Sequence, residues 1–409
     1  MRRYRARGTA RHAAGLVSPT AAMFSRVALE RQAGERLRRL GGAAADRFAQ
    51  RLRPSRKKMR ALTVGTRGRM QWREVPVPPP PGPQAAVVHP IAVATCDLDR
   101  LLALGRTPFL LPLHFGHECV AEVLSVGERV EQVRPGDRVV VPFQINCGNC
   151  AQCRAGHTGN CLSVPPVSMY GFGVGGGHWG GAVSDQLAVP YADGMLVPLP
   201  PGIDPATAAS IADNVCDGYR HIGPHARLIE ESDGEVLILA GMARRPVFSA
   251  SVPLYAGLVA RALGARRVHF FDSRDHVRHH AERLGLESHR PGELRGATPT
   301  RLVVDATGSS PGMRAALEHT APDGVCSSVG MMHRFARIPA GMMFGRNATL
   351  HVGRTHARAL IPRVLELITA GDLRPELVTT ELAPLDDAPA AINSHVHGQS
   401  TKTILVETG

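Results

Sequence analysis

The 409-residue sequence contains no run of about 18 apolar residues, the length a membrane-spanning helix needs, and its N-terminus has no continuous apolar segment. The first absence argues against a membrane span, and the second argues against a cleavable secretory signal, which needs an apolar stretch. We therefore expect a cytoplasmic protein. The chain is too long for one ordinary hydrophobic core, so two domains are predicted.

Acidic residues are scarce at the N-terminus, where residues 1–58 hold 16 Lys and Arg against 3 Asp and Glu. The rest of the chain carries equal numbers of basic and acidic residues, so the whole net charge of +13 lies in this extension. A transit-like peptide and a tether to an anionic surface are functional explanations, and a disordered or mis-started extension is the simpler one, which we favour. For the folded part we predict neither a nucleic-acid nor a membrane partner.

Three further segments differ in their apolar pattern. Residues 59–215 show short apolar runs broken by Pro and Gly, which predicts an irregular β-rich domain. Residues 216–354 alternate apolar strands with helical stretches, which predicts a parallel βαβ sheet. Residues 355–409 contain a helical stretch and a terminal strand, and we expect them to return to the first domain.

Half of the eight cysteines fall within one short stretch, with the spacing of a metal site. Four thiolates are the ligand set that Zn²⁺ takes tetrahedrally at structural sites, and they leave no position for a substrate. We therefore predict a structural zinc that stabilises the fold. Its ligands are Cys147, Cys150, Cys153 and Cys161.

Two more metal-binding residue types lie upstream, Cys96 and the His117 of a Gly-His-Glu sequence. Either residue alone is more often a packed side chain than a ligand. Taken with GHECVAEVLSVGERV, RPGDRVVVPF and the cysteine cluster, however, the chain from Met59 onward resembles the zinc-containing alcohol dehydrogenases of the medium-chain dehydrogenase/reductase superfamily. The resemblance implies an α/β protein with a GroES-like β-rich catalytic domain and a Rossmann-type, doubly wound, parallel-sheet NAD-binding domain.

The resemblance also implies a second zinc, held by Cys96, His117 and Asp213, and directly involved in catalysis. Three protein ligands leave one coordination position open for a substrate oxygen. Glu118 beside this metal is expected to exchange as a ligand, and Asp99 matches the carboxylate that orients the zinc-binding histidine. The remaining cysteines are expected to be structural or core residues: Cys119, Cys216 and Cys326.

The predicted nucleotide domain keeps part of a dinucleotide-binding pattern. The strand VLILAG ends at Gly241, and the next strand ends at Asp272, an acid placed for a ribose hydroxyl, which favours NAD over NADP. Lys402 matches a basic position of the family near the pyrophosphate. We therefore predict cofactor contacts from Gly241, Asp272 and Lys402.

The glycine pattern G-x-G-x-x-G itself is missing from this turn. Ala240, Met242 and Pro253 stand where related sequences place glycines, and the loop between strand and helix is longer than expected. Added Cβ atoms obstruct a ligand that must approach the main chain, and Pro253 lacks an N–H donor. Arg244 or Arg245 offers an alternative phosphate contact.

Other positions also depart from the family pattern. Leu98 stands where many members carry the Ser or Thr that passes the alcohol proton outward, and Leu101 replaces a frequent histidine. Water or His178 offers another proton path. Ala121 replaces a usual glycine, and the Gly-rich residues 171–181 precede a strand-like segment, so we predict a mobile loop rather than a phosphate loop.

These features lead to three hypotheses. The first is an enzyme that transfers hydride between an alcohol, aldehyde or ketone and NAD, with NADP less favoured, and two zincs per chain. The second is a pseudoenzyme that keeps the fold and both zincs but has impaired nucleotide binding. The third, binding to nucleic acid or membrane through residues 1–58, rests on charge alone. The family resemblance further implies a homodimer or homotetramer.

Overall fold

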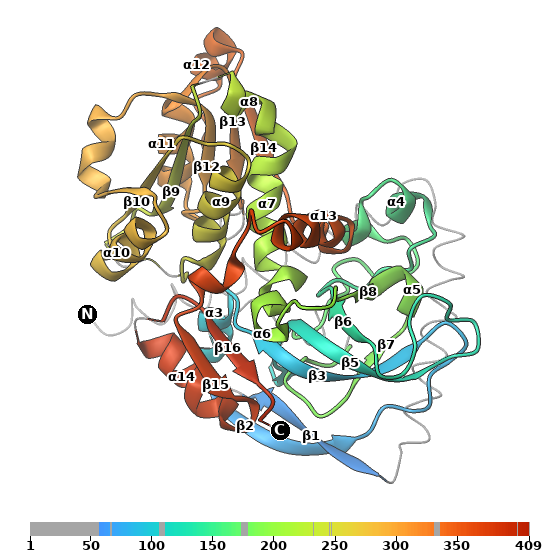
Figure 1. Cartoon of the computed structure of the whole chain (residues 1–409). Helices are drawn as coiled ribbons and strands as arrows, with labels where there is room; N and C mark the ends of the chain where they lie inside the picture. Colours follow the sequence, from blue (N-terminus) through green and yellow to red (C-terminus); the bar gives the residue numbers. More distant parts are fainter. Residues whose placement is uncertain are drawn as a thin grey trace, which may run out of the picture.

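The structure is a computed structural model, and it describes residues 57–408 except 66–67, 106–110, 173–178, 232, 245, 247, 331–335 and 399. The predictions for the basic extension, His178, Arg245 and most of the Gly-rich loop lie outside the described residues. Two sheet-based units lie side by side, with the helix α7 (Asn214–Ile222) between them (Figure 1).

The first unit is a six-stranded parallel sheet in the order β11-β10-β9-β12-β13-β14. Alternate residues of β9 enter two different cores: Ile238 lies in the core that includes α9, and Leu239 lies in the core that includes α11. Both faces are therefore covered by helices, as the continuous apolar run of this strand predicts. Its strands are β9 (Glu235–Gly241), β10 (Arg267–Asp272), β11 (Glu287–His289), β12 (Thr300–Asp305), β13 (Thr320–Ser328) and β14 (Thr349–Val352).

Helices connect these parallel strands. Helix α9 follows β9, α10 follows β10, and α11 follows β12, so these three strand-to-strand connections cross a face of the sheet. The helices of this unit are α8 (Ala226–Glu230), α9 (Ser251–Ala262), α10 (Asp275–Arg283), α11 (Ser310–Glu318) and α12 (Ala340–Arg346).

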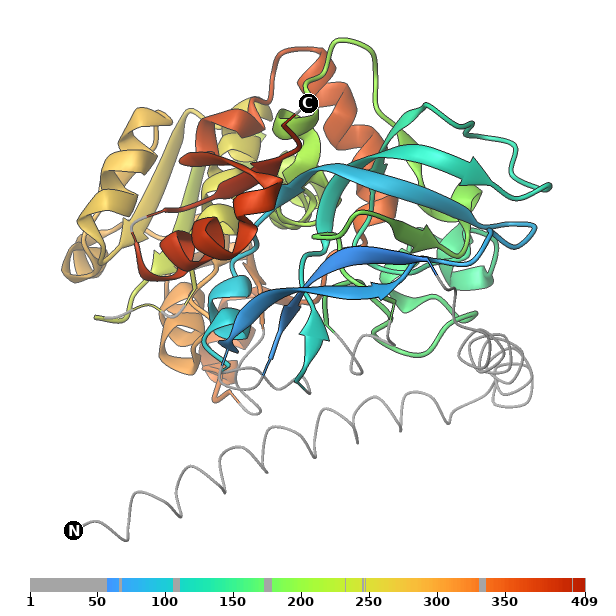
Figure 2. The ribbon, with the colours of Figure 1, turned by 90° about the horizontal axis from the view of Figure 1, so that it is seen from below.

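The second unit contains a mainly antiparallel seven-stranded sheet and a three-stranded sheet, β2-β1-β4. The C-terminal strand β16 pairs antiparallel with β3, so the end of the chain completes the larger sheet (Figure 2). Its strands are β1 (Lys58–Val64), β2 (Met70–Pro76), β3 (Ala86–Ala94), β4 (Leu113–His114), β5 (Glu118–Val126), β6 (Arg138–Val141), β7 (Leu187–Val189), β8 (Val197–Pro198), β15 (Glu381–Pro384) and β16 (Thr403–Val406).

Short helices of this unit carry or flank the residues of interest. The helices of this unit are α3 (Asp99–Ala103), α4 (Ala151–Arg154), α5 (Ala192–Met195), α6 (Pro205–Ala208), α13 (Ala357–Thr369) and α14 (Ala388–His397).

In the described part of the chain, no helix is both long enough and apolar enough to cross a membrane.

Close packing between α7 and α9 joins the two units. A Cβ added at Gly218 of α7 would lie 2.8 Å from the backbone nitrogen of Ala256 in α9, closer than real Cβ contacts. Glycine at this position therefore lets the two helices approach each other. The contact brings the N-terminus of α9 close to the end of the second unit that holds the predicted metal ligands.

Buried His395 in α14 predicts an acid-sensitive fold. Burial, with the charge of Lys402 adding to it, lowers the pKa of His395 from 6.5 to about 4. The folded state therefore binds this proton less readily than the unfolded state, so the stability is present above pH 6.5 and is lost as the pH falls toward 4. We expect the wild type to lose about 3 kcal/mol more unfolding free energy over this range than His395→Gln, given about 1.4 kcal/mol per pKa unit.

Chemical denaturation at a series of pH values measures this difference. Acid release of metal affects the wild type and the variant alike, so the difference between the two curves isolates His395. Parallel pH profiles would show that the buried imidazole contributes nothing to acid unfolding.

Candidate functional site

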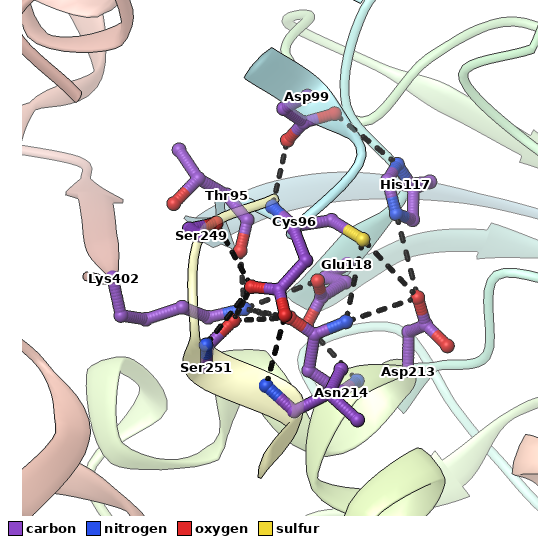
Figure 3. Close-up of polar contacts among 12 residues, drawn as sticks. Thr95, Cys96, Asp99, His117, Glu118, Asp213, Asn214, Ser249, Ser251 and Lys402 are labelled. Carbon is purple, nitrogen blue, oxygen red and sulfur yellow. Dashed lines mark hydrogen bonds and ion pairs between the residues drawn. The ribbon is translucent and has the colours of Figure 1, made fainter. Parts of the chain in front are cut away.

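The three predicted ligands of the catalytic zinc converge from three separate segments. Cys96 lies between β3 and α3, His117 directly precedes β5, and Asp213 directly precedes α7. Oδ2 of Asp213 lies 3.6 Å from Sγ of Cys96 and 3.5 Å from Nε2 of His117 (Figure 3). Donors about 3.3 to 3.8 Å apart are what bonds of about 2.0 to 2.3 Å to a tetrahedral zinc require.

Unpartnered polar atoms mark this cluster as a place for a cation. Among the described residues, neither ring nitrogen of His117 has a hydrogen-bond partner, although the ring is buried. Burial raises the pKa of the Cys96 thiol, and the carboxylates of Asp213 and Glu118 raise it further. A divalent cation would satisfy the imidazole and stabilise the thiolate, so this donor set fits zinc.

Asp99 supports the cluster from α3. Its Oδ2 accepts the backbone N–H of Cys96 at 2.8 Å, and its Oδ1 lies 3.9 Å from Nδ1 of His117. The first contact fixes the turn that carries the thiol. The second places the carboxylate on the side of the ring opposite to Asp213, where it can orient the imidazole.

Glu118 belongs to the same cluster but is engaged by Lys402. Both carboxylate oxygens of Glu118 lie 3.1 Å from Nζ of Lys402, and the two side chains are completely buried. The ammonium group also donates to the backbone oxygen of Thr95 and, at 2.8 Å, to Oδ1 of Asn214. Burial lowers the pKa of Lys402, but Glu118, Tyr255, Cys96 and Asp97 together outweigh burial, so the pKa is raised. Lys402 was predicted to contact the cofactor, and in the structure its ammonium group contacts Glu118, Thr95 and Asn214.

Asn214 is a site residue that the sequence analysis missed. Its Nδ2 donates to Sγ of Cys96 at 3.3 Å and to Oδ2 of Asp213 at 3.2 Å, while its Oδ1 accepts from Ser251 of α9 at 2.8 Å. One amide therefore links two predicted metal ligands to the helix of the other unit. Its position directly after Asp213 was the available signal.

The four clustered cysteines also come together, with all ligand atoms within 4.8 Å of one another. None of the eight cysteines, which lie in the described part of the chain, forms a disulfide. Backbone N–H groups point at the sulfurs, as from Leu162 to Cys150 and from Ser163 to Cys161, both at 3.4 Å. Such donors stabilise thiolates, so the cluster fits a structural zinc.

A third group of ligand types lies on β10 and β11, formed by His269, Glu287 and His289. Nδ1 of His269 lies 3.1 Å from Nε2 of His289, but both oxygens of Glu287 are engaged by Arg267 at 2.9 and 3.0 Å. A bidentate ion pair and an imidazole hydrogen bond account for this group without a metal.

The cofactor contacts predicted from Gly241 and Asp272 lie at the ends of β9 and β10. A Cβ at Gly241 would lie 2.4 Å from Oδ2 of Asp272, so only glycine fits there. Arg274 donates hydrogen bonds to both carboxylate oxygens of Asp272, from Nε to Oδ1 at 2.9 Å and from Nη2 to Oδ2 at 2.7 Å. The acid is completely buried, and its oxygens face Arg274 in place of a ribose hydroxyl.

The N-terminus of α9 does not present free donors for a phosphate. The backbone N–H groups of Ser251 and Val252 donate to Asp97 at 2.9 and 3.2 Å, and Pro253 has none. The residues of this turn therefore do not fit a pyrophosphate as they stand. Asp97 is a second residue that the sequence analysis missed.

Two leucines and three cysteines that the sequence singled out lie in or against apolar surroundings. Leu101 is buried, and Leu98 packs against the larger hydrophobic core. Cys119, Cys216 and Cys326 are completely or almost completely buried, and Sγ of Cys216 faces the backbone oxygen of Ala357 at 3.7 Å. These three thiols lie outside both zinc-type clusters, as expected for core residues.

Comparison with known proteins gives two family models that together span both units. Residues 82–201 match the model described as "Alcohol dehydrogenase GroES-like domain", and residues 252–370 match "Zinc-binding dehydrogenase". The predicted fold, a GroES-like domain with a Rossmann-type doubly wound sheet, is confirmed by these matches and by the strand order. The stretch between the two matches contains Asp213 and the altered loop after β9.

Individual relatives agree with these models. A Mycobacterium tuberculosis protein described as "Probable zinc-binding alcohol dehydrogenase" is 30% identical over 338 residues, covering 81% of this chain and 83% of the relative. Geraniol dehydrogenase of Castellaniella defragrans is 29% identical over 335 residues, covering 77% and 88%. The solved structure of an alcohol dehydrogenase from Thermus sp. ATN1 superposes with a TM-score of 0.76 at 28% identity, covering 86% of this chain and all of that one.

Proposed function

Because the chain belongs to the zinc-containing alcohol dehydrogenases of the medium-chain dehydrogenase/reductase superfamily, we propose that it transfers hydride between an alcohol or carbonyl substrate and a nicotinamide dinucleotide. The observation that carries the proposal is the convergence of Cys96, Asp213 and a buried His117 whose ring nitrogens have no hydrogen-bond partner among the described residues. One catalytic and one structural zinc per chain are part of the proposal. NAD is favoured over NADP by the sequence position of Asp272 at the end of β10, and a ribose would have to displace Arg274 from this carboxylate.

The three ligands would hold the catalytic ion near electrical neutrality. Cys96 and Asp213 each supply one negative charge, His117 supplies none, and a fourth coordination position stays open. A zinc ion bound there supplies a Lewis acid, which lowers the pKa of an alcohol or polarises a carbonyl group. Asp99 holds the turn of Cys96 and faces His117, so it acts as a positioning residue.

The surrounding residues limit the access of water and fix the ligands. The rings of Phe143 and Phe172 lie 5.9 and 4.8 Å from the ring of His117, so aromatic surface faces the imidazole. Asn214 donates to the sulfur of Cys96, which reduces the charge density on the thiolate. Glu118 stays paired with Lys402 and would reach a metal only by leaving that ammonium group.

Zinc content and a cofactor-dependent assay test the proposed function. We expect the full chain to bind two zinc ions and to reduce NAD⁺ with a short or aromatic alcohol, followed by the absorbance of NADH. Removing the metal with a chelator should abolish turnover, and adding zinc should restore it. Two bound zincs without turnover on any such alcohol or aldehyde, with NAD(H) or NADP(H), would argue against the proposal.

A second candidate function is a zinc-containing protein of the same fold that no longer binds a dinucleotide productively. It is favoured by Asp97 at the N-terminus of α9, by Arg274 on Asp272 and by the missing donor at Pro253. Cofactor affinity separates the two candidates: micromolar binding of NADH supports the enzyme, and no binding at millimolar NADH or NADPH supports the second candidate.

The oligomeric state and the location stay proposals. The family membership suggests a homodimer or homotetramer, and the cytoplasm is the expectation from the sequence. Light scattering on the purified chain measures the first, and fractionation of the source cells measures the second.

A further inference from the structure

The carboxylate of Asp97 binds the N-terminus of α9, although Asp97 belongs to the other unit of the protein. Oδ1 accepts the N–H of Ser251 at 2.9 Å and the hydroxyl of Ser249 at 2.8 Å, and Oδ2 accepts the N–H of Val252 at 3.2 Å. The hydroxyl of Ser251 also donates to Oδ1. Asp97 is only 8% exposed, so this is a buried charge with four donors.

The position matters because α9 is the first helix after β9, the strand at the centre of the parallel sheet. In sheets of this order the diphosphate of a dinucleotide lies at the N-terminus of this helix, where unpaired N–H groups and the helix dipole favour negative charge. A diphosphate and the Asp97 carboxylate would therefore compete for the same backbone N–H donors at the start of α9.

No donor of the first turn is left over for a second anion. Ser251 and Val252 donate to Asp97, Pro253 has no N–H, and Leu254 donates within the helix to Ala250 at 3.1 Å. A negatively charged diphosphate would also meet the charge of Asp97, which is only 8% exposed, and like charges repel more strongly when they are shielded from water. Both cannot occupy this position together.

Asp272, the acid predicted to bind a ribose hydroxyl of the dinucleotide, is also engaged by another side chain of the protein. Arg274 engages both oxygens of Asp272 and donates to the backbone oxygen of Phe248 at 2.7 Å. The ring of Phe248 lies so close to Gly308 that a Cβ there would be 2.5 Å from it. The segment before α9 is therefore held by Arg274 at one end and, through Ser249, by Asp97 at the other.

We infer that Asp97 is an internal anion that takes the diphosphate position and thereby limits dinucleotide binding. The inference rests on the proposed function, since it assumes that the chain uses a nicotinamide dinucleotide. Binding then requires the turn of Asp97 to separate from α9. Because Asp97 directly follows Cys96, this separation also moves the turn that carries a predicted metal ligand, which couples cofactor entry to the metal site.

Titration of NADH into the full zinc-loaded chain, followed by nicotinamide fluorescence, tests the inference. We expect Asp97→Asn, which keeps the shape of the side chain but removes its charge, to bind NADH at least about tenfold more tightly than the wild type. The matched control is Asp193→Asn, because Asp193 also accepts backbone N–H groups, from Glu131 and Gln132, but on other elements. Asp97→Ser provides a second variant if the asparagine variant does not fold.

Hydrogen exchange of the Ser251 and Val252 amides supplies a readout that does not depend on NADH. We expect faster exchange of both amides in Asp97→Asn and its slowing by inorganic pyrophosphate, with neither effect in Asp193→Asn. Equal or weaker NADH binding by Asp97→Asn, when the wild type binds, overturns the inference and leaves the proposed function standing. If no variant binds NADH or NADPH, protection by pyrophosphate upholds the inference while the proposed function fails, and the absence of protection overturns both.

Discussion

Replacement of His117 by alanine is expected to remove the catalytic zinc and to lower turnover by on the order of a thousandfold, since Lewis-acid stabilisation is worth several kcal/mol. The change leaves only Cys96 and Asp213 as protein ligands, whereas a catalytic zinc with an open position is held by three. One zinc per chain should remain, bound by the four clustered cysteines. Elemental analysis and steady-state kinetics measure the two effects on the same preparation.

His89→Gln is the matched control for this experiment. His89 also lies in the second unit, but its ring contacts the backbone oxygen of Asp185 and the carboxylate of Glu407 instead of the metal cluster. The control should keep both zincs and most of the activity. Wild-type turnover in His117→Ala, or two zincs in that variant, would show that Cys96, His117 and Asp213 do not form the catalytic site.

The features predicted best from the sequence are those fixed by local spacing. Four cysteines within one loop can reach a single ion without help from the rest of the fold, and the structure brings their ligand atoms together. The alternation of apolar strands and helical stretches in residues 216–354 likewise predicted a parallel sheet, and the structure shows it, with β9 buried along almost its whole length.

Contacts between distant segments could not be predicted in the same way. Lys402 and Glu118 are 284 residues apart, and Asp97 and Ser251 are 154 residues apart. Whether a lysine faces a phosphate or a buried carboxylate depends on the packing of both units, which the sequence does not state. The family position of Lys402 therefore predicted a cofactor contact, whereas the structure shows an ion pair beside the metal cluster.

Asn214 shows how the two kinds of information combine. The sequence identified its neighbour Asp213 from ligand type, but only the structure shows that Asn214 contacts Cys96, Lys402 and Ser251. One amide thus connects a predicted metal ligand, the buried ion pair and α9. Asn214 and Asp97 both contact α9, so hydrogen bonds run from the predicted zinc ligands to the junction of the two units.

Replacement of Cys153 by alanine is expected to destabilise the protein more than any other single substitution proposed for it. A structural zinc contributes about 10 to 16 kcal/mol of binding free energy in small zinc domains, and a three-ligand site loses much of it. A loss of about 5 kcal/mol corresponds to a melting temperature lower by about 10 to 20 °C in a domain of 150 to 250 residues. The loop also contacts the segment before α13, where Gly159 donates to Nδ1 of His356 at 3.1 Å.

Calorimetry and zinc analysis together separate the metal effect from the loss of a buried side chain. Cys326→Ala is the control, because it removes a buried thiol of β13 that lies outside the cluster, and it should lower stability far less and keep both zincs. Cys153→His should retain zinc and recover part of the stability, since three cysteines and one histidine also bind structural zinc. If both alanine variants melt alike and bind two zincs, the four cysteines contribute only ordinary packing.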